Sequence, residues 1–143
     1  MRISDVIRNK GDLVVTVRSA DTVETLLQRL AEHRIGAVVV SDDDGATVAG
    51  IVSERDVVRT LGEVGARVLQ LPVADIMTAD VQTCGPEDDL QTLARQMTDH
   101  RVRHVPVVVD GRLQAIVSIG DIVKHRIDEL QGERDQLVGY IQQ

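Results

Sequence analysis

Short apolar runs and a helical pattern of apolar positions follow one another along the first part of the chain. Residues 22–33 (TVETLLQRLAEH) carry apolar side chains at the spacing of an amphipathic helix. Residues 14–17 (VVTV) before this helix and residues 37–40 (AVVV) after it are short apolar runs that predict strands. The polar turn SDDDG leads to a further strand, GIVS at residues 50–53, and a helix is expected to follow it. Because these strands are almost entirely apolar, we expect both faces of their sheet to be covered.

The same order of elements returns in the second half of the chain. Three pairs of segments match in order and residue type: ISDVI (3–7) with VADIM (73–77), HRIGAVVV (33–40) with HRVRHVPV (100–107), and GIVSERD (50–56) with AIVSIGD (115–121). Each copy is therefore predicted to be a β-α-β-β-α unit preceded by a short helix. A unit of about 60 residues is marginally stable alone. We expect the two copies to pack their sheets together about a pseudo-twofold axis, each completing the other's core.

The predicted fold class is thus α/β (α+β), with two tandem repeats. The first domain is expected at residues 3–62 and the second at residues 73–127, with a linker at residues 63–72. Residues 128–143 are expected to form a helical extension. In the last helix, apolar residues recur with alternating four- and three-residue spacing, which predicts a short coiled coil and a homodimer. We call these residues the apolar stripe: Val123, Ile127, Leu130, Leu137 and Ile141.

Each copy ends in the pattern Ser-x-x-Asp where a strand should pass into a helix. The residues are Ser53 and Asp56 in the first copy, and Ser118 and Asp121 in the second. The serine can accept a hydrogen bond from the first helical turn and the acid can bond back, which is a helix cap that needs no ligand. The same groups also suit a nucleotide, because a helix N-terminus and a hydroxyl attract phosphate, and a carboxylate accepts hydrogen bonds from ribose hydroxyls. The residues alone leave both interpretations open.

The duplicated pattern resembles a cystathionine-β-synthase (CBS) domain pair, also called a Bateman module. The resemblance rests on the two closing motifs and on DIMT at residues 75–78, and it covers about residues 3–127. It is greatest to stand-alone bacterial CBS-pair proteins. It implies two related clefts that bind adenosine-containing regulatory ligands such as AMP, ADP, ATP, NAD or S-adenosylmethionine. It also implies that no cofactor is required.

Carried onto this sequence, the resemblance gives the candidate residues their roles. Asp56 and Asp121 would hold ribose hydroxyls, and Ser53 and Ser118 would contact phosphate or ribose. Main-chain groups near Thr16 and Thr83 would contact the adenine edge. Aliphatic or polar residues would line the walls, namely Ile35, Gly36, Ala37, Val102, Arg103, His104, Val105 and Pro106. Such walls suit a chain with no Phe or Trp, in which aromatic stacking is absent.

The two copies differ in ways that predict unequal clefts. Gly120 stands where Arg55 stands, so the second motif has no cation between its serine and its aspartate. The second copy instead offers Arg103 and His104. We therefore expect the base and sugar in the second cleft, with Arg55 reaching across the pseudo-axis to a phosphate.

Composition excludes several classes of partner. The net charge is −7 and the sequence pI about 5.0, so the chain lacks the basic surface that a nucleic acid or a polybasic membrane anchor needs. No apolar run approaches the ~20 residues of a membrane span, and residues 1–12 show no signal peptide. The single Cys84 cannot form an internal disulfide. We therefore expect a reduced, cytoplasmic protein.

Other reactive residues favour structural roles. His100 and His104 are not expected to share a helical face, and no suitable ligand stands beside them, so no metal site is predicted. Cys84 has no CxxC motif or catalytic partner around it. The basic stretch at residues 8–11 (RNKG) fits either an exposed loop or a flap over phosphates. The sequence therefore predicts a non-enzymatic ligand sensor, and the alternative is a structural or protein-interaction dimer whose motifs only cap helices.

Overall fold

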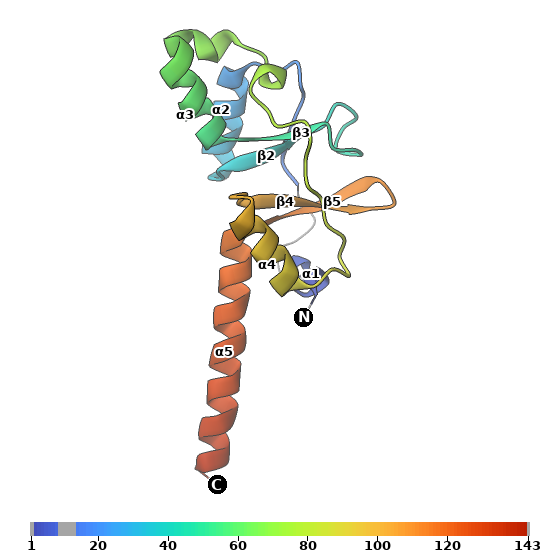
Figure 1. Cartoon of the computed structure of the whole chain (residues 1–143), viewed down its shortest axis with the longest axis vertical. Helices are drawn as coiled ribbons and strands as arrows, with labels where there is room; N and C mark the ends of the chain where they lie inside the picture. The colour runs from blue at the N-terminus through green and yellow to red at the C-terminus, as the bar shows by residue number, and fades with distance from the viewer. Residues whose placement is uncertain (1, 9–13, 143) are drawn as a thin grey trace.

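Two repeats with the same order of elements lie one above the other along the long axis of the molecule (Figure 1). The structure, a computed structural model, describes residues 2–8 and 14–142. The first repeat contains a three-stranded sheet of order β1-β2-β3, with β1 parallel and β3 antiparallel to β2. Its elements are β1 (Thr16–Val17), α2 (Val23–His33), β2 (Ala37–Val40), β3 (Gly50–Ser53) and α3 (Glu54–Val64).

The second repeat keeps this order except at its first strand. The segment VQTC (81–84), which corresponds to the strand predicted at residues 14–17, is reduced to a single bridge, in which the Cys84 N–H donates to the Pro106 carbonyl at 3.0 Å. The elements are α4 (Leu90–Asp99), β4 (His104–Val109), β5 (Arg112–Ser118) and α5 (Ile119–Ile141). The helix α1 (Ile3–Ile7) precedes the first repeat, and the short 3-10 helices η1 (Gly65–Gln70) and η2 (Val73–Asp75) connect the two repeats. The predicted tandem α/β architecture is confirmed.

The hairpin of β4 and β5 follows from its local sequence. Its turn residues, Asp110 and Gly111, have φ angles of 51° and 78°, the left-handed backbone that tight hairpin turns require. Pro106 cannot donate a ladder hydrogen bond. A register shift lies close behind it, between Val107 and Val108, and bulges are one of the places where prolines occur in sheets.

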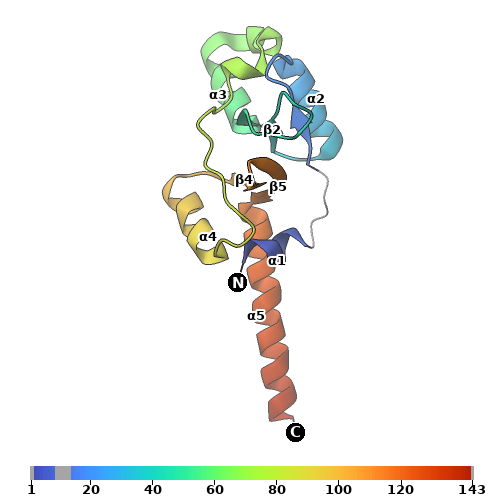
Figure 2. The same cartoon turned by 90° about the vertical axis from the view of Figure 1, so that its right-hand side faces the viewer.

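Buried side chains form two clusters, one in each repeat. Each cluster also includes residues from the segment that precedes the other repeat, which we call its leading segment. Ile3 and Val6 of α1 pack in the cluster of the second repeat. Val73 and Ile76, from the segment that corresponds to α1, pack in the cluster of the first repeat. Figure 2 shows α1 beside α4 and α5, away from α2 and β2 of its own repeat.

Matching backbone hydrogen bonds hold the two exchanged segments. The Ser4 N–H donates to the Pro86 carbonyl at 2.8 Å, and the equivalent Ala74 N–H donates to the Ser19 carbonyl at 3.0 Å. The repeats complete each other's cores, as the sequence predicts, and they do so through crossed leading segments, because each short helix buries its apolar residues in the core of the other repeat.

The helix α5 projects well beyond the rest of the described chain (Figures 1 and 2). The apolar stripe is exposed along it, from 46% at Leu130 to 79% at Ile141. Within the described part of the chain, no helix combines the length and the apolar character needed to cross a membrane.

Candidate functional site

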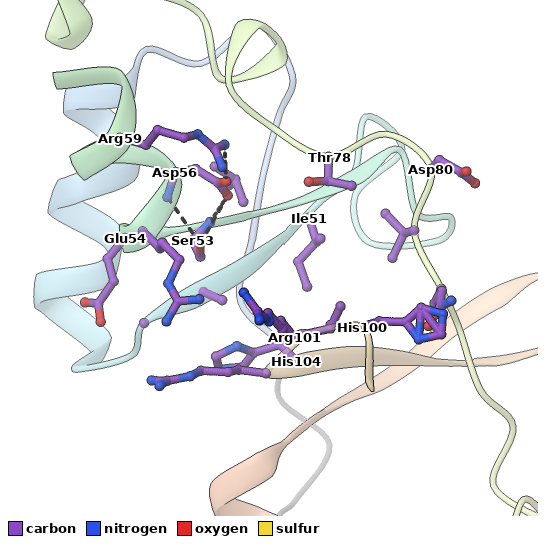
Figure 3. Close-up of a pocket in the computed structure, with 18 residues that line it drawn as sticks. Ile51, Ser53, Glu54, Asp56, Arg59, Thr78, Asp80, His100, Arg101 and His104 are labelled. Carbon is purple, nitrogen blue, oxygen red and sulfur yellow. Dashed lines mark hydrogen bonds and ion pairs between the residues drawn. The ribbon is translucent and has the colours of Figure 1, made fainter. Parts of the chain in front are cut away.

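A cleft of about 500 Å³ lies between the two repeats. This volume is within the usual range for small-molecule sites. Its walls come from the β2–β3–α3 region of the first repeat, from the segment after η2, and from the junction of α4 and β4 in the second repeat (Figure 3). The lining consists of residues 36, 37, 51–56, 59, 78, 80–82 and 100–104.

The Ser-x-x-Asp motif of the first repeat forms a helix cap and also lines this cleft. The Ser53 hydroxyl accepts from the Asp56 N–H at 3.4 Å, and Oδ2 of Asp56 accepts from the Ser53 N–H at 2.9 Å. The other carboxylate oxygen of Asp56, Oδ1, accepts from the Arg59 guanidinium at 2.9 Å. Figure 3 shows these three side chains on one wall of the cleft, opposite Arg101 and His104. The motif is therefore a helix cap that also faces a cleft, so the two interpretations of the sequence are compatible.

The motif of the second repeat forms the same cap in a different setting. The Ser118 N–H donates to Oδ2 of Asp121 at 2.9 Å, and the Asp121 N–H donates to the Ser118 hydroxyl at 3.1 Å. Neither side chain lines the cleft. The segment that corresponds to residues 78–82 begins at Arg8 and continues into residues 9–13, which lie outside the described residues, as does most of the possible RNKG flap.

The structure brings together eight of the predicted site residues. These are Gly36, Ala37, Ser53, Arg55, Asp56, Val102, Arg103 and His104. The other predicted site residues lie outside the cleft lining, namely Thr16, Ile35, Thr83, Val105, Pro106, Ser118 and Asp121. Thr16 belongs to β1, Ile35 packs against the core of the first repeat, and Pro106 lies within β4. The described cleft thus centres on the first motif, whereas we expected the base and sugar at the second.

The sequence analysis missed two parts of the cleft lining, namely the segment at residues 78–82 and the residues at the end of α4. Thr78, Asp80 and Gln82 reach the cleft because the chain after η2 crosses β3, where the Ile51 N–H donates to the Thr78 carbonyl at 3.0 Å. Arg101 follows His100, the C-cap residue of α4, and has a left-handed backbone with φ of 56°. The repeat alignment offered a clue, since Arg101 directly precedes the predicted wall at Val102.

Gly50 permits the close approach of residues 77 and 78 to β3. A Cβ at this position would lie 2.8 Å from the Thr78 carbonyl oxygen and 2.8 Å from Sδ of Met77. Gly50→Ala is expected to lower the free energy of unfolding by about 1–3 kcal/mol, because the backbone at Thr78 must shift. Thermal or urea unfolding measures this cost.

Gly62→Ala is the matched control for this substitution. A Cβ at Gly62, within α3, meets nothing within 4 Å. This variant is expected to stabilise the protein by up to about 1 kcal/mol, since alanine favours a helix. If Gly50→Ala were as stable as the wild-type protein, residues 77 and 78 would not be closely packed against β3.

Cations outnumber acids in the cleft, although the whole chain is acidic. Arginines line it from both repeats, at positions 55, 59, 101 and 103, whereas its acids are Glu54, Asp56 and Asp80. His100 and His104 also lie there, and Nδ1 of His100 is 3.2 Å from the Gln96 carbonyl oxygen. Because Arg59 and Asp56 form an ion pair with each other, the remaining arginines make the cleft attractive to an anion.

The described residues carry little that suits covalent or metal chemistry. Burial raises the pKa of the Cys84 thiol to about 12, with a smaller contribution from the charge of Asp88. The thiol is therefore protonated at neutral pH and is a poor nucleophile. Among the described residues, no group of three or more His, Cys, Asp or Glu side chains could hold a metal ion.

Comparisons with known proteins agree with this geometry. The family model described as "CBS domain" matches residues 4–63 and residues 73–128. The CBS domain-containing protein CBSX3, mitochondrial, of Arabidopsis thaliana is 35% identical over 147 residues, which cover 98% of this chain and 71% of that protein.

Two solved structures extend the comparison to the fold. A CBS-domain containing protein from Agrobacterium tumefaciens is 43% identical with a TM-score of 0.84, and the match covers 88% of this chain and 99% of that one. A CBS domain protein from Pyrobaculum aerophilum, solved in complex with AMP, is 28% identical with a TM-score of 0.74. That match covers 85% of this chain and 89% of the other.

Proposed function

Since this chain belongs to the CBS domain family, we propose that it is a regulatory module that senses an adenosine-containing ligand in the cleft between its repeats. One observation carries the proposal: the Ser53–Asp56 cap lies on one wall of a cleft whose opposite wall contains Arg101 and Arg103. A carboxylate acceptor thus faces guanidinium donors across a space of ligand size. The AMP complex of the Pyrobaculum aerophilum relative supports this class of ligand.

The contacts of Asp56 allow a ribose to bind there. A carboxylate has about four acceptor positions, and the donors that contact Asp56 are the Ser53 N–H, the Ser53 hydroxyl and Arg59. The Arg59 side chain is 62% exposed. An exposed ion pair contributes little to stability, so ribose hydroxyls can replace Arg59 at small cost.

Sensing would follow from the position of the cleft. A ligand there contacts the first repeat, the segment at residues 78–82 and the α4–β4 junction of the second repeat at the same time. It would therefore favour the relative orientation of the repeats that fits it best, by no more than its difference in affinity for the two states. Such a module needs no reaction, and we propose that the protein is not an enzyme. The cytoplasmic location also stays a prediction from the sequence.

Titration calorimetry with AMP, ADP, ATP, NAD and S-adenosylmethionine tests the proposed function. We expect at least one of them to bind with a Kd below about 1 mM, which corresponds to about −4 kcal/mol. Guanosine nucleotides serve as controls for the base. If none of the adenosine compounds binds, the proposed function is wrong, and the structural dimer is the better interpretation.

We also propose that the apolar stripe of α5 forms the interface of a homodimer. Leu137 is 63% exposed on a helix that projects from the body. Leu137→Asp is expected to shift the protein from dimer to monomer, because it places a charge in the centre of a hydrophobic seam. Light scattering measures the mass of the particle.

Gln136→Asp is the matched control, since it places the same charge one residue away and off the apolar stripe. It should leave the dimer intact. An unchanged dimer in Leu137→Asp, or after deletion of residues 128–143, would show that α5 is not the interface.

A further inference from the structure

A second cavity, of about 410 Å³, opens beside the cleft and shares one edge with it. Four residues line both spaces: Arg55, Arg101, Val102 and Arg103. Three of the four are arginines, and we call them the arginine edge. The second cavity is completed by Met97, Thr98 and Ile119, so none of its lining residues is acidic.

The arginine edge is free to bind an anion as far as the described residues show. Among them, no carboxylate forms an ion pair with Arg55, Arg101 or Arg103. Guanidinium groups bind phosphate in a bidentate manner and stay charged at all relevant pH values. Three of them beside one pair of cavities offer more donors than a single phosphate group can use.

The end of α4 positions the side chain of Arg101. Its φ of 56° lies in the left-handed region, which glycine or asparagine usually occupies after a helix. The equivalent Arg34 has nearly the same φ of 55°, so this conformation belongs to the helix end in both repeats. In Figure 3 the Arg101 side chain extends into the cleft, opposite Ser53 and Asp56.

The start of α5 fixes one end of the arginine edge. Ile119, which lines the second cavity, is the first residue of α5. Its N–H donates to the Arg103 carbonyl at 2.9 Å, so the backbone of Arg103 is held beside both cavities. The charged groups of the second cavity are therefore its three arginines, Arg55, Arg101 and Arg103.

We infer that the site selects nucleotides by the length of the phosphate chain and prefers a nucleoside triphosphate to a monophosphate. The inference rests on the proposed function, since the nucleoside occupies the cleft at Asp56. The phosphate chain runs from there along the arginine edge into the second cavity. A monophosphate reaches only the first part of this edge and leaves the remaining arginines without a counter-charge.

Calorimetry with ATP, ADP and AMP in the presence of EDTA tests the inference on the wild-type protein. We expect affinity to rise from AMP to ADP to ATP, with ATP about tenfold or more tighter than AMP, as added charge-assisted hydrogen bonds predict. If AMP binds and ATP binds no more tightly, the inference is wrong while the proposed function stands. If neither binds, the inference is wrong, and binding of NAD or S-adenosylmethionine then decides the proposed function.

Arg101→Gly separates the arginine edge from the nucleoside site. Glycine adopts the left-handed backbone without strain, so this variant folds at least as well as the wild type. We expect about a tenfold loss of ATP affinity and less than about a threefold change for AMP. Equal losses for both nucleotides would overturn the inference, because Arg101 would then serve the nucleoside or its first phosphate.

Arg34→Gly is the matched control. Arg34 occupies the equivalent position at the end of α2, has nearly the same φ of 55°, and lines neither cavity. It gains the same relief of strain and loses the same charge, and it should bind ATP as the wild type does. A loss of ATP affinity equal to that of Arg101→Gly would show only an effect of net charge and would contradict the inference.

Discussion

Asp56→Asn is expected to weaken adenine-nucleotide binding by about tenfold or more, because the amide replaces a carboxylate acceptor with a donor. A ribose presents two hydroxyl donors to this position, and the new NH₂ group cannot accept from either. The fold should persist, since the amide oxygen can still accept from the Ser53 N–H, as Oδ2 of Asp56 does at 2.9 Å. Calorimetry gives the affinity, and thermal unfolding gives the stability of the same sample.

The equivalent residue in the second repeat provides the control. Asp121 makes the same capping contacts but lies outside the cleft lining. Both Asn variants should lose a similar, small stability of about 0.3–1 kcal/mol, because each removes a negative charge from a helix N-terminus. Only Asp56→Asn should lose affinity. If Asp121→Asn loses it and Asp56→Asn does not, the ligand binds beside the second motif, as the sequence alone suggested.

Ile3→Ala is expected to lower the free energy of unfolding by about 2–5 kcal/mol and to loosen the second repeat rather than the first. The side chain is fully buried, and its neighbours include Leu90, Val105 and Val117 of the second repeat. Hydrogen exchange should therefore accelerate more in β4 and β5 than in β2 and β3. Urea unfolding measures the total cost.

Ile76→Ala is the reciprocal variant. Ile76 is also buried, but it packs in the core of the first repeat. A similar total cost is expected, with faster exchange in β2 and β3. If each variant instead loosened the repeat that carries it in the sequence, the exchange of leading segments would be wrong.

Local patterns were enough to predict most elements of the fold. The helix at residues 22–33 begins at Val23 with Thr22 as its cap, close to the prediction from its periodicity. The turn at Asp110 and Gly111 and the strand irregularity after Pro106 also follow from single residues with special backbone chemistry. Such features depend on neighbours in the sequence, so a single sequence contains them.

Features that depend on distant contacts were not predictable in the same way. The repeat alignment equates α1 with the segment at residues 73–77, but it does not say against which sheet each one packs. The first strand of the second repeat shortens to a bridge at Cys84, although its sequence, VQTC, was expected to be extended like VVTV. The exchange depends on packing between the repeats, which aligned sequences do not describe.

The candidate site divides along the same line. The Ser53–Asp56 cap and the wall at residues 102–104 were predicted, because both belong to the repeated motifs. The choice of the first motif for the described cleft was not, since it depends on where residues 78–82 cross β3. The contribution of Arg101 depends on its own left-handed backbone after α4, and the sequence did not predict that conformation.

A crystal structure of the protein grown with AMP tests the central claim most directly. We predict the adenosine between the two repeats, with ribose hydroxyls hydrogen-bonded to Asp56 and the phosphate facing Arg55. Nucleotide bound at another surface, or an empty cleft in crystals soaked well above the Kd measured in solution, would contradict the claim.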